Sequence, residues 1–350
     1  MSDRPVFVIG CPRSGTTMLQ LMLHSHPRIA VPPETRFLVP AYYKRRKFGD
    51  MRSGEARRTL AEWMAGDRTT KFRELGIDRD DFIRQAVEGP GSLGSVIGIA
   101  LKMYADRFGK ARWGDKRPSY VKQVDMLMRL FPDAQFVHLI RDGRDCVSSL
   151  KEMPWFTLDS YHAMSTWGEA IDAGRRLQKT MSEDSYYEVR YEDLTNDPVT
   201  EMKKLCHFLE EDFDLAMTSP REAASVAVPV HKVWHSNTHG EVTKARVGSW
   251  SKRLEVWEIE LCEQVLGERL EANGYELSGA PKAAKEHVLA FQRAQQKRKA
   301  ARMRRRMRDQ FNRFREPGPV AALLTSGQLA LAGVPMQRER IDELEQLSRF

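Results

Sequence analysis

The sequence contains few cysteines, and their spacing does not suit metal binding or cross-linking. Cys11, Cys146, Cys206 and Cys262 are far apart, and no C-x-x-C pair occurs. This pattern disfavours both a disulfide framework and a zinc site. A reducing compartment is the simplest interpretation, so we predict a cytoplasmic protein, with association at a membrane surface as the alternative.

Long hydrophobic runs are also missing. The N-terminal residues show no charged segment followed by an apolar stretch and a small-residue cleavage site, so no secretory signal is expected. The most apolar late segment, residues 319–335, is interrupted by polar residues and is shorter than the about 20 residues that a spanning helix needs. We expect this segment to be packed or interfacial rather than transmembrane.

The net charge of +8 is concentrated in one part of the chain. Residues 282–316 contain 13 Lys or Arg and three acids, so the rest of the chain carries −2. In this region Met303, Met307, Phe311 and Phe314 fall on one helical face and arginines fill the others. Such a helix suits packing on its own domain, on a second subunit or on an anionic membrane, and no nucleic-acid-binding motif accompanies the charge.

Three segments share one pattern, in which an apolar strand is followed by a turn and an amphipathic helix. The strands are expected at residues 5–10, 134–140 and 186–194. After the third, Asn196 and Asp197 are candidate helix caps and Pro198 suits the first helical position. This alternation predicts an α/β fold with an open parallel sheet flanked by helices.

Composition divides the 350 residues into two parts. Residues 42–109 are charge-rich and mostly helical in pattern, and we expect them to form a layer beside the sheet. After Tyr275 the sequence becomes a long polar helical pattern that runs to Pro317. We therefore predict a main domain at residues 1–280 and a basic amphipathic helical extension at residues 281–350.

The segment FVIGCPRSGTTMLQLML, residues 7–23, resembles a phosphate-binding loop with one departure. Gly10 and Gly15 have the spacing of G-x-x-x-x-G-K-[ST], but Thr16 stands where the lysine belongs. Backbone N–H groups of such a loop and the positive end of the next helix favour an anion. Because Arg13 adds a guanidinium that can donate two hydrogen bonds to phosphate or sulfate, we predict an anion site rather than a plain turn.

The second unit lacks the carboxylate with which a nucleoside triphosphatase holds magnesium. Its strand ends at Arg141, and Ser149 lies about two helical turns further on. An arginine and a hydroxyl suit a phosphate group better than a metal ion. The predicted ligand therefore carries two separated anionic groups, and no metal is expected.

The motifs PRSGTT, FVHLIRDGRDCVSSL and RVGSW together resemble those of sulfotransferases that use 3′-phosphoadenosine 5′-phosphosulfate (PAPS). The resemblance covers about residues 5–275 and implies a P-loop-like catalytic domain, PAPS as donor and adenosine 3′,5′-bisphosphate (PAP) as product. In that family the first loop holds the 5′-phosphosulfate, and an arginine and a serine of the second motif hold the 3′-phosphate. These roles would fall on Arg13, Ser14, Gly15, Thr16 and Thr17, and on Arg141 and Ser149.

The resemblance also implies catalytic residues. Glu34, in VPPETRF, matches a glutamate that acts as general base in the tyrosylprotein branch of the family. Lys116, in WGDKRP, is similar to the family's lysine that contacts the oxygen bridging sulfur and phosphorus. With Arg13, it would stabilise the charge that develops during transfer.

The residues alone leave other roles open for these positions. Glu34 also suits a helix N-terminus or an ion pair with Arg36, and Lys116 also suits an exposed position after a tight turn. His24 and His26 compete for the role of base, although the sequence SHP is typical of a helix end.

The late RVGSW segment resembles the part of the family that closes over the 3′-phosphate. Arg246 would contact that phosphate, Gly248 would let the backbone approach, and Trp250 would stack on adenine. Lys252 and Arg253 are alternatives to Arg246.

Upstream of that segment, His231, His235 and His239 are four residues apart, which is a spacing found in metal sites. The Ser, Asn, Thr and Gly residues between them disfavour a continuous helix, so we predict a lid loop instead.

The acceptor is left open by the sequence. Residues expected to line its pocket suit a peptide, a sugar, a small phenol or a lipid headgroup, and they are Tyr42, Tyr43, Arg45, Trp155 and Phe156. We predict transfer of a sulfuryl group to a hydroxyl or an amine. The alternatives are a P-loop nucleotide kinase, which the missing lysine disfavours, and a non-catalytic nucleotide-binding scaffold that acts through its basic tail.

Overall fold

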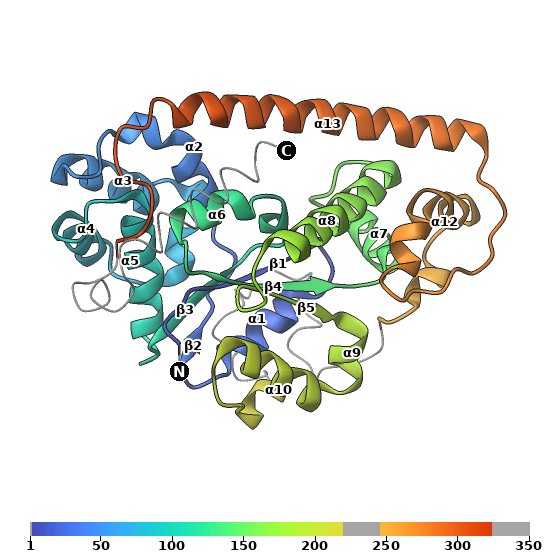
Figure 1. Ribbon diagram of the computed structural model, residues 1–350, viewed down its shortest axis with the longest axis horizontal. Coiled ribbons are helices and arrows are strands. Elements are labelled where there is room, and N and C mark those ends of the chain that lie inside the picture. The colour runs from blue at the N-terminus through green and yellow to red at the C-terminus, as the bar shows by residue number, and fades with distance from the viewer. Residues whose placement is uncertain (1, 220–245, 324–350) are drawn as a thin grey trace.

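The computed structural model describes residues 2–219 and 246–323. Its centre is a parallel sheet of five strands in the order β2-β3-β1-β4-β5 (Figure 1). The strands are β1 (Val6–Gly10), β2 (Ile29–Ala30), β3 (Arg112–Lys116), β4 (Gln135–Ile140) and β5 (Tyr186–Arg190). The predicted α/β fold is confirmed. The strands β2 and β3 lie on one side of β1 within the sheet, and β4 and β5 lie on the other. The strand order therefore reverses at β1, and in such folds ligands bind at the carboxyl end of the strand where this happens.

The sequence of β1 explains its central place. Val6 and Val8 point into one core and Phe7 and Ile9 into the other, and all four side chains are fully buried. A continuous apolar run is the expected pattern for a strand covered on both faces. Val8 pairs in register with Lys116 of β3, which brings that lysine close to the loop after β1.

Helices cover both faces of the sheet (Figure 1). One face carries α1 (Thr16–His24), α9 (Tyr191–Asn196) and α10 (Pro198–Leu209), and the other carries α6 (Val124–Leu130), α7 (Gly143–Lys151) and α8 (Ser160–Thr180). The predicted helical layer consists of α2 (Leu38–Phe48), α3 (Gly54–Gly66), α4 (Arg79–Glu88) and α5 (Leu93–Asp106), and α12 (Val256–Glu271) packs on α7 and α8. Short 3-10 helices are η1 (Arg68–Thr70), η2 (Phe72–Leu75), η3 (Pro118–Lys122), η4 (Leu215–Thr218) and η6 (Ser249–Lys252).

The third strand-helix unit differs from the prediction at one boundary. The strand was expected to reach residue 194, but β5 ends at Arg190 and α9 begins at Tyr191. The polar residues after Arg190 turn away from the sheet as this short helix. The predicted cap is confirmed, because Asp197 Oδ1 accepts a hydrogen bond from Thr200 N over 3.1 Å and Pro198 begins α10.

Within the described part of the basic extension, one long helix, α13 (Lys285–Arg313), runs along the edge of the molecule from α12 past α8 to α2 (Figure 1). Two of its arginines, Arg298 and Arg302, lie 2.7 and 3.3 Å from the carboxylate of Glu169 in α8. The side chains of Phe291 and Ala294 in α13 itself are buried. The division of the chain near residue 280 stays a prediction, but this helix packs on the main domain.

The apolar face predicted for this helix is not the face that packs. Met303, Met307, Phe311 and Phe314 are 52–90% exposed. The helix is held instead by the small buried stripe around Phe291 and by ion pairs, which a pattern based on apolar residues alone does not detect.

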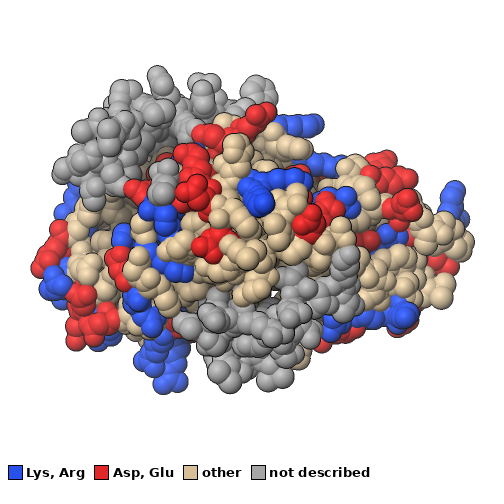
Figure 2. Space-filling model, turned by 90° about the horizontal axis from the view of Figure 1, so that it is seen from below, with Lys and Arg blue, Asp and Glu red and all other residues tan. Residues whose placement is uncertain are grey.

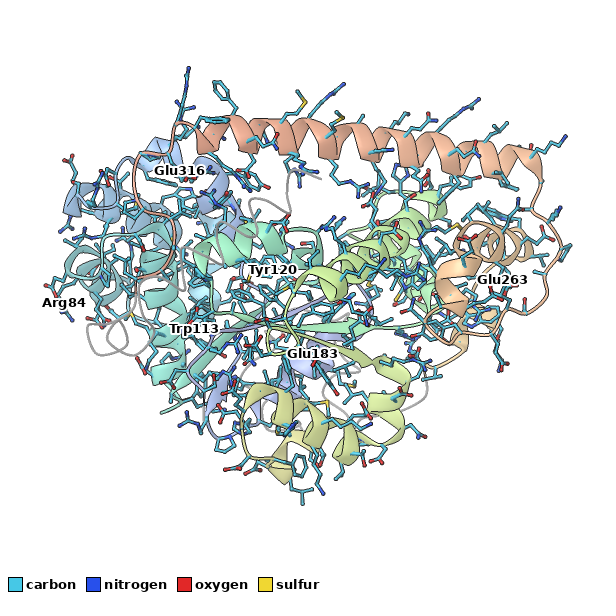
Figure 3. All side chains as sticks on the ribbon, viewed as in Figure 1. Arg84, Trp113, Tyr120, Glu183, Glu263 and Glu316 are labelled. Atoms are coloured by element: carbon cyan, nitrogen blue, oxygen red, sulfur yellow. The ribbon has the colours of Figure 1, made fainter. Side chains whose placement is uncertain are left out.

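The end of α13 explains why two residues expected at the acceptor pocket lie elsewhere. Tyr42 and Arg45 are buried, and Arg45 Nη1 lies 3.5 Å from Asp309 Oδ1. Arg45 Nε also donates to Glu316, which Figure 3 labels beside this end of the helix, over 2.7 Å. Tyr42 and Arg45 therefore connect α2 to the extension and do not line an open pocket.

The face turned away from α13 carries charges of both signs (Figure 2). Viewed from the side away from α13, acidic and basic side chains are interspersed among the others (Figure 2). Within residues 2–219 and 246–323, no helix is both long and apolar enough to cross a bilayer. The first residues of the apolar segment at 319–335 pack on the domain, since Gly94 N donates to Val320 O and Ala322 N to Leu130 O.

Candidate active site

The loop between β1 and α1 requires glycine at both of the motif's positions. A Cβ on Gly10 would lie 2.6 Å from Leu139 O, and one on Gly15 would lie 2.5 Å from a ring carbon of Tyr191. Gly15 also has φ 97°, in the region that favours glycine. The loop therefore lies so close to β4 and α9 that neither position has room for a side chain. Helix α1 begins at Thr16, directly after the loop, so its positive N-terminal end lies beside the loop.

A buried hydroxyl in this loop has no partner. Among the described residues, no group hydrogen-bonds Ser14 Oγ, although the side chain is fully buried. An unsatisfied buried hydroxyl costs free energy unless a ligand or water bonds it. The loop therefore offers an oxygen ligand both backbone N–H groups and a side-chain donor.

The predicted second anion site lies against the first. Arg141 follows β4 and Ser149 lies on α7, and their side chains are both buried. Arg13 Nε donates to Ser149 Oγ over 3.0 Å, and Arg141 Nη1 donates to Arg13 O over 3.2 Å. The structure thus brings together three residues that the sequence assigned to two separate phosphate groups.

Positive charge is crowded around this contact. Burial lowers the pKa of Arg13, and so do the positive charges of Arg141, Arg246 and Arg253. The Arg141 guanidinium stacks 4.5 Å from the ring centroid of Tyr191. Like charges held this close in a partly buried site favour binding of an anion with more than one negative charge.

The late segment is attached to the same region by one buried carboxylate. Asp145, in the first turn of α7, accepts hydrogen bonds from Gly248 N over 2.9 Å and from Trp250 N over 2.8 Å. It also lies 3.4 Å from Arg141. Gly248 has φ 68°, so this turn favours glycine for its conformation. Asp145 was not among the predicted site residues.

The other predicted residues of the late segment also lie near Arg141 and α7, but each has different neighbours. Arg246 is exposed, and its carbonyl accepts a hydrogen bond from Arg141. The Arg144 guanidinium lies 4.1 Å from the centroid of the Trp250 ring, and Trp250 is partly buried against the core. Arg253, the alternative to Arg246, donates to Glu152 over 2.8 Å.

Glu34 and Lys116 come together at the other side of the loop. Lys116 Nζ lies 3.8 Å from Glu34 Oε2 and donates to Thr17 Oγ1 over 3.3 Å. The lysine is 4% exposed, whereas the glutamate side chain is 26% exposed. The alternative ion pair of Glu34 is also present, since Arg36 Nε lies 3.7 Å from its Oε1. A carboxylate, an ammonium group and the end of the loop therefore share one site.

Glu34 is held in its charged form. Burial raises its pKa, but the surrounding positive charges outweigh burial and place the pKa below the ordinary value. Those charges belong to Lys116, Arg117, Lys71 and Arg36. An ionised carboxylate can accept a proton from a bound hydroxyl, which is the state that a general base requires.

The two competing histidines are engaged with the main chain. His24 Nδ1 accepts from Val31 N over 3.2 Å, and His26 Nδ1 accepts from Arg28 N over 3.1 Å. Burial and the charge of Lys110 lower the pKa of His24 to about 3. His24 is therefore neutral at physiological pH and contributes to the end of α1 rather than to an open site.

Metal binding finds no support in the described ranges, where no group of three or more His, Cys, Asp or Glu side chains is placed to hold an ion. The histidine series His231, His235 and His239 lies outside the described residues.

Fold and site together define a class of protein. It is an α/β protein with a lysine-free glycine loop after the central strand and a cluster of arginines beside that loop. Residues 5–214, more than half of the chain, match the sulfotransferase family. The chain belongs to this family.

Among curated proteins, the chain is similar to protein-tyrosine sulfotransferases. The chain is 27% identical to a protein-tyrosine sulfotransferase of Drosophila melanogaster over 242 residues, which are 66% of this chain and 43% of that protein. It is 28% identical to protein-tyrosine sulfotransferase A of Caenorhabditis elegans over 60% of this chain and 50% of that protein. The chain thus spans about half the length of the curated relatives it matches.

Solved structures share the fold at lower identity. The sulfotransferase domain of the curacin biosynthetic pathway has a TM-score of 0.54 and 19% identity, and the match covers 79% of this chain and 99% of that one. The sulfotransferase domain of the Synechococcus PCC 7002 olefin synthase has a TM-score of 0.50 and 24% identity, with 75% and 95% covered.

The predicted cytoplasmic location is wrong by this comparison. The matching protein-tyrosine sulfotransferases are enzymes of the Golgi membrane and not of the cytoplasm. The prediction rested on four unpaired cysteines, all of which are buried. A buried thiol is protected from oxidation in a reducing and in an oxidising compartment alike. The four cysteines therefore do not indicate the compartment.

Proposed function

We propose that this protein transfers a sulfuryl group from PAPS to an acceptor hydroxyl. The acceptor oxygen forms a bond to sulfur while the bond between sulfur and the bridging oxygen breaks. The acceptor proton passes to Glu34, and PAP departs with the electrons of the broken bond. The observation that carries this proposal is the contact of two anion-binding segments, through Arg13 and Ser149, beside the Glu34–Lys116 pair.

The donor would be held at both ends. Backbone N–H groups of residues 13 and 15–17 and the unpartnered Ser14 hydroxyl suit the 5′-phosphosulfate. Arg141, Ser149 and Arg246 suit the 3′-phosphate, because their positive charge and hydroxyl lie about Arg13. The ring of Trp250 is suited to stacking on adenine.

The catalytic roles follow from position and charge. Glu34 is ionised and partly exposed, so an acceptor hydroxyl can reach it. Lys116 is buried and donates to Thr17 at the start of α1, and this position supports a role in stabilising the charge that would develop on the bridging oxygen of the donor. Arg13 would share that stabilisation.

A tyrosine phenol is the acceptor we propose first. This choice is supported by the names of the curated relatives, which act on protein tyrosine. A phenol also suits a weak base, because its proton is more acidic than that of an aliphatic alcohol. The cations Arg36, Lys71 and Arg117 around Glu34 would further favour the phenolate as it forms.

The test is transfer of a labelled sulfuryl group from PAPS to a tyrosine-containing peptide and to a small phenol. Wild type is expected to label the phenolic oxygen. Glu34→Gln is expected to retain PAP affinity and to lose about 10²- to 10⁴-fold in rate, as for removal of a general base. Equal rates in the two proteins would contradict the role of Glu34, and a wild type that binds PAPS but labels neither compound would contradict the phenolic acceptor.

A further inference from the structure

A second buried aspartate lies behind the Glu34–Lys116 pair. Asp115 is fully buried and accepts three hydrogen bonds from three parts of the chain. Its Oδ2 accepts from Tyr120 Oη over 2.7 Å and from Thr35 Oγ1 over 3.0 Å, and its Oδ1 accepts from Lys116 N over 2.9 Å. Tyr120, labelled near the centre of Figure 3, is itself fully buried.

Two of these donors are chain neighbours of the proposed catalytic residues. Thr35 follows Glu34 directly, and Lys116 follows Asp115. The segment that carries Glu34 leaves the sheet after β2, which pairs with β3 only through Ile29 and Ala30. Beyond this short pairing, the bond from Thr35 to Asp115 ties the Glu34 segment to the end of β3.

We infer that Asp115 is a positioning residue that holds Glu34 and Lys116 at their working separation. This inference rests on the proposed function, because it gives those two residues their roles. Asp115 is fully buried, so it would act on the site only through its hydrogen bonds with Thr35 Oγ1 and Lys116 N. A carboxylate suits this task, since its two oxygens can accept all three bonds, whereas an asparagine has one oxygen to accept them.

The surroundings of Asp115 are consistent with this role. Burial raises the pKa of Asp115, and the hydrogen bonds from Tyr120, Thr35 and Lys116 N and the positive charge of Lys116 offset only part of that rise. A buried carboxylate keeps its negative charge only where donors of this kind surround it. The three bonds therefore depend on one another, and the loss of one weakens the whole link.

A measurable consequence concerns Glu34. Its pKa is kept low by cations on three different segments, so it depends on where the Glu34 segment lies. The charged and titratable groups that face it are Lys116, Arg117, Lys71, Arg36 and Tyr120. If the Thr35–Asp115 bond is lost, Glu34 moves away from Lys116 and its pKa rises.

The test compares Thr35→Val with Thr35→Ser. Valine has a similar shape to threonine but no hydroxyl, whereas serine keeps the donor. Thr35→Val is expected to lower kcat by about tenfold to hundredfold through misplacement of Glu34, with PAP affinity unchanged, and Thr35→Ser is expected to stay near wild type. Asp115→Asn should act in the same direction as Thr35→Val.

The decisive measurement is the pH titration of the Glu34 carboxylate by NMR, in full-length protein labelled with [13C]glutamate. The Glu34 signal is assigned by its absence from the spectrum of Glu34→Gln. We expect the Glu34 signal to titrate at higher pH in Thr35→Val than in wild type or Thr35→Ser. An unchanged titration and kcat in Thr35→Val would overturn the role of Asp115. Because the titration needs no acceptor, it separates this outcome from failure of the proposed function, which would leave wild type inactive whatever Glu34 does.

Discussion

Arg13 Nε donates a hydrogen bond to Ser149 Oγ over 3.0 Å, joining two segments that lie 136 residues apart in the chain. Through this bond the first phosphate loop and the second anion site become one surface. A ligand with a single phosphate would leave part of this positive charge uncompensated. A ligand with phosphate groups at both ends of a nucleoside would compensate it, which is the basis of the donor assignment.

Ser149→Ala should weaken binding of PAP by about tenfold to hundredfold, because a hydrogen bond to a charged group is lost. Binding of adenosine 5′-monophosphate, which lacks the 3′-phosphate, should change little. Ser148→Ala is the matched control, since its hydroxyl donates to Asp145 O over 3.0 Å and does not reach Arg13. Titration calorimetry measures both affinities, and equal losses in the two variants would contradict the assignment of Ser149.

Lys116→Met should lower the rate of sulfuryl transfer by about 10²- to 10³-fold, the usual cost of removing one stabilising group from a transition state. Its pH profile should also shift, because the loss of the ammonium group raises the pKa of Glu34. Lys122→Met is the control, as that lysine pairs with Glu169 at 3.1 Å, away from the loop. Single-turnover kinetics would check this, and comparable rates in the two variants would count against Lys116.

Asp145→Asn should weaken the attachment of the RVGSW segment. The variant leaves the N–H groups of Gly248 and Trp250 with poorer acceptors and Arg141 without its carboxylate at 3.4 Å. We expect a loss of about 1–3 kcal/mol in the free energy of unfolding, together with weaker PAP binding. Urea denaturation would measure the first quantity.

The control for Asp145 is Asp172→Asn, which removes a surface ion pair with Arg269. Such pairs contribute about 0–1 kcal/mol, so this variant should keep both stability and PAP affinity. If Asp145→Asn behaves like the control, the late segment is not held in the way described.

Acid should destabilise the protein partly through His24. Its pKa is lowered by burial to about 3 in the folded chain, so between the ordinary value near 6.5 and that value the unfolded chain binds one more proton. The free energy of unfolding therefore falls as pH falls through this window, by up to about 1.4 kcal/mol per pH unit from this group. His24→Asn should reduce the slope by that amount in urea titrations, and an unchanged slope would show that His24 charges freely in the fold.

Much of the fold and many of the site residues follow from local patterns. VFVI predicts a buried strand because no polar residue interrupts it. The glycines of the loop predict a tight turn, because other residues do not readily adopt its conformation. Arg141 and Ser149 could be assigned because each ends or follows a recognisable strand. These are short-range signals, and the structure places their residues together at the carboxyl end of β1 and β4.

What the sequence could not reveal is contact between distant segments. Asp145 binds Trp250 across 105 positions, and Thr35 binds Asp115 across 80 positions, and neither pair has a periodic pattern to mark it. For a related reason, the apolar pattern of α13 does not identify the face that packs on the domain. Its packing depends on the ion pairs of Arg298 with Glu169 and of Asp309 with Arg45, and a helical pattern alone does not identify these partners.

The most direct test of the donor assignment is the affinity of wild-type protein for PAP compared with adenosine 5′-monophosphate and with ATP plus magnesium, measured by calorimetry under one set of conditions. We predict that PAP binds more tightly than either by about 100-fold or more, which corresponds to about 2.7 kcal/mol from contacts with the 3′-phosphate. Equal or tighter binding of ATP with magnesium would contradict the sulfotransferase donor site and favour a nucleotide kinase.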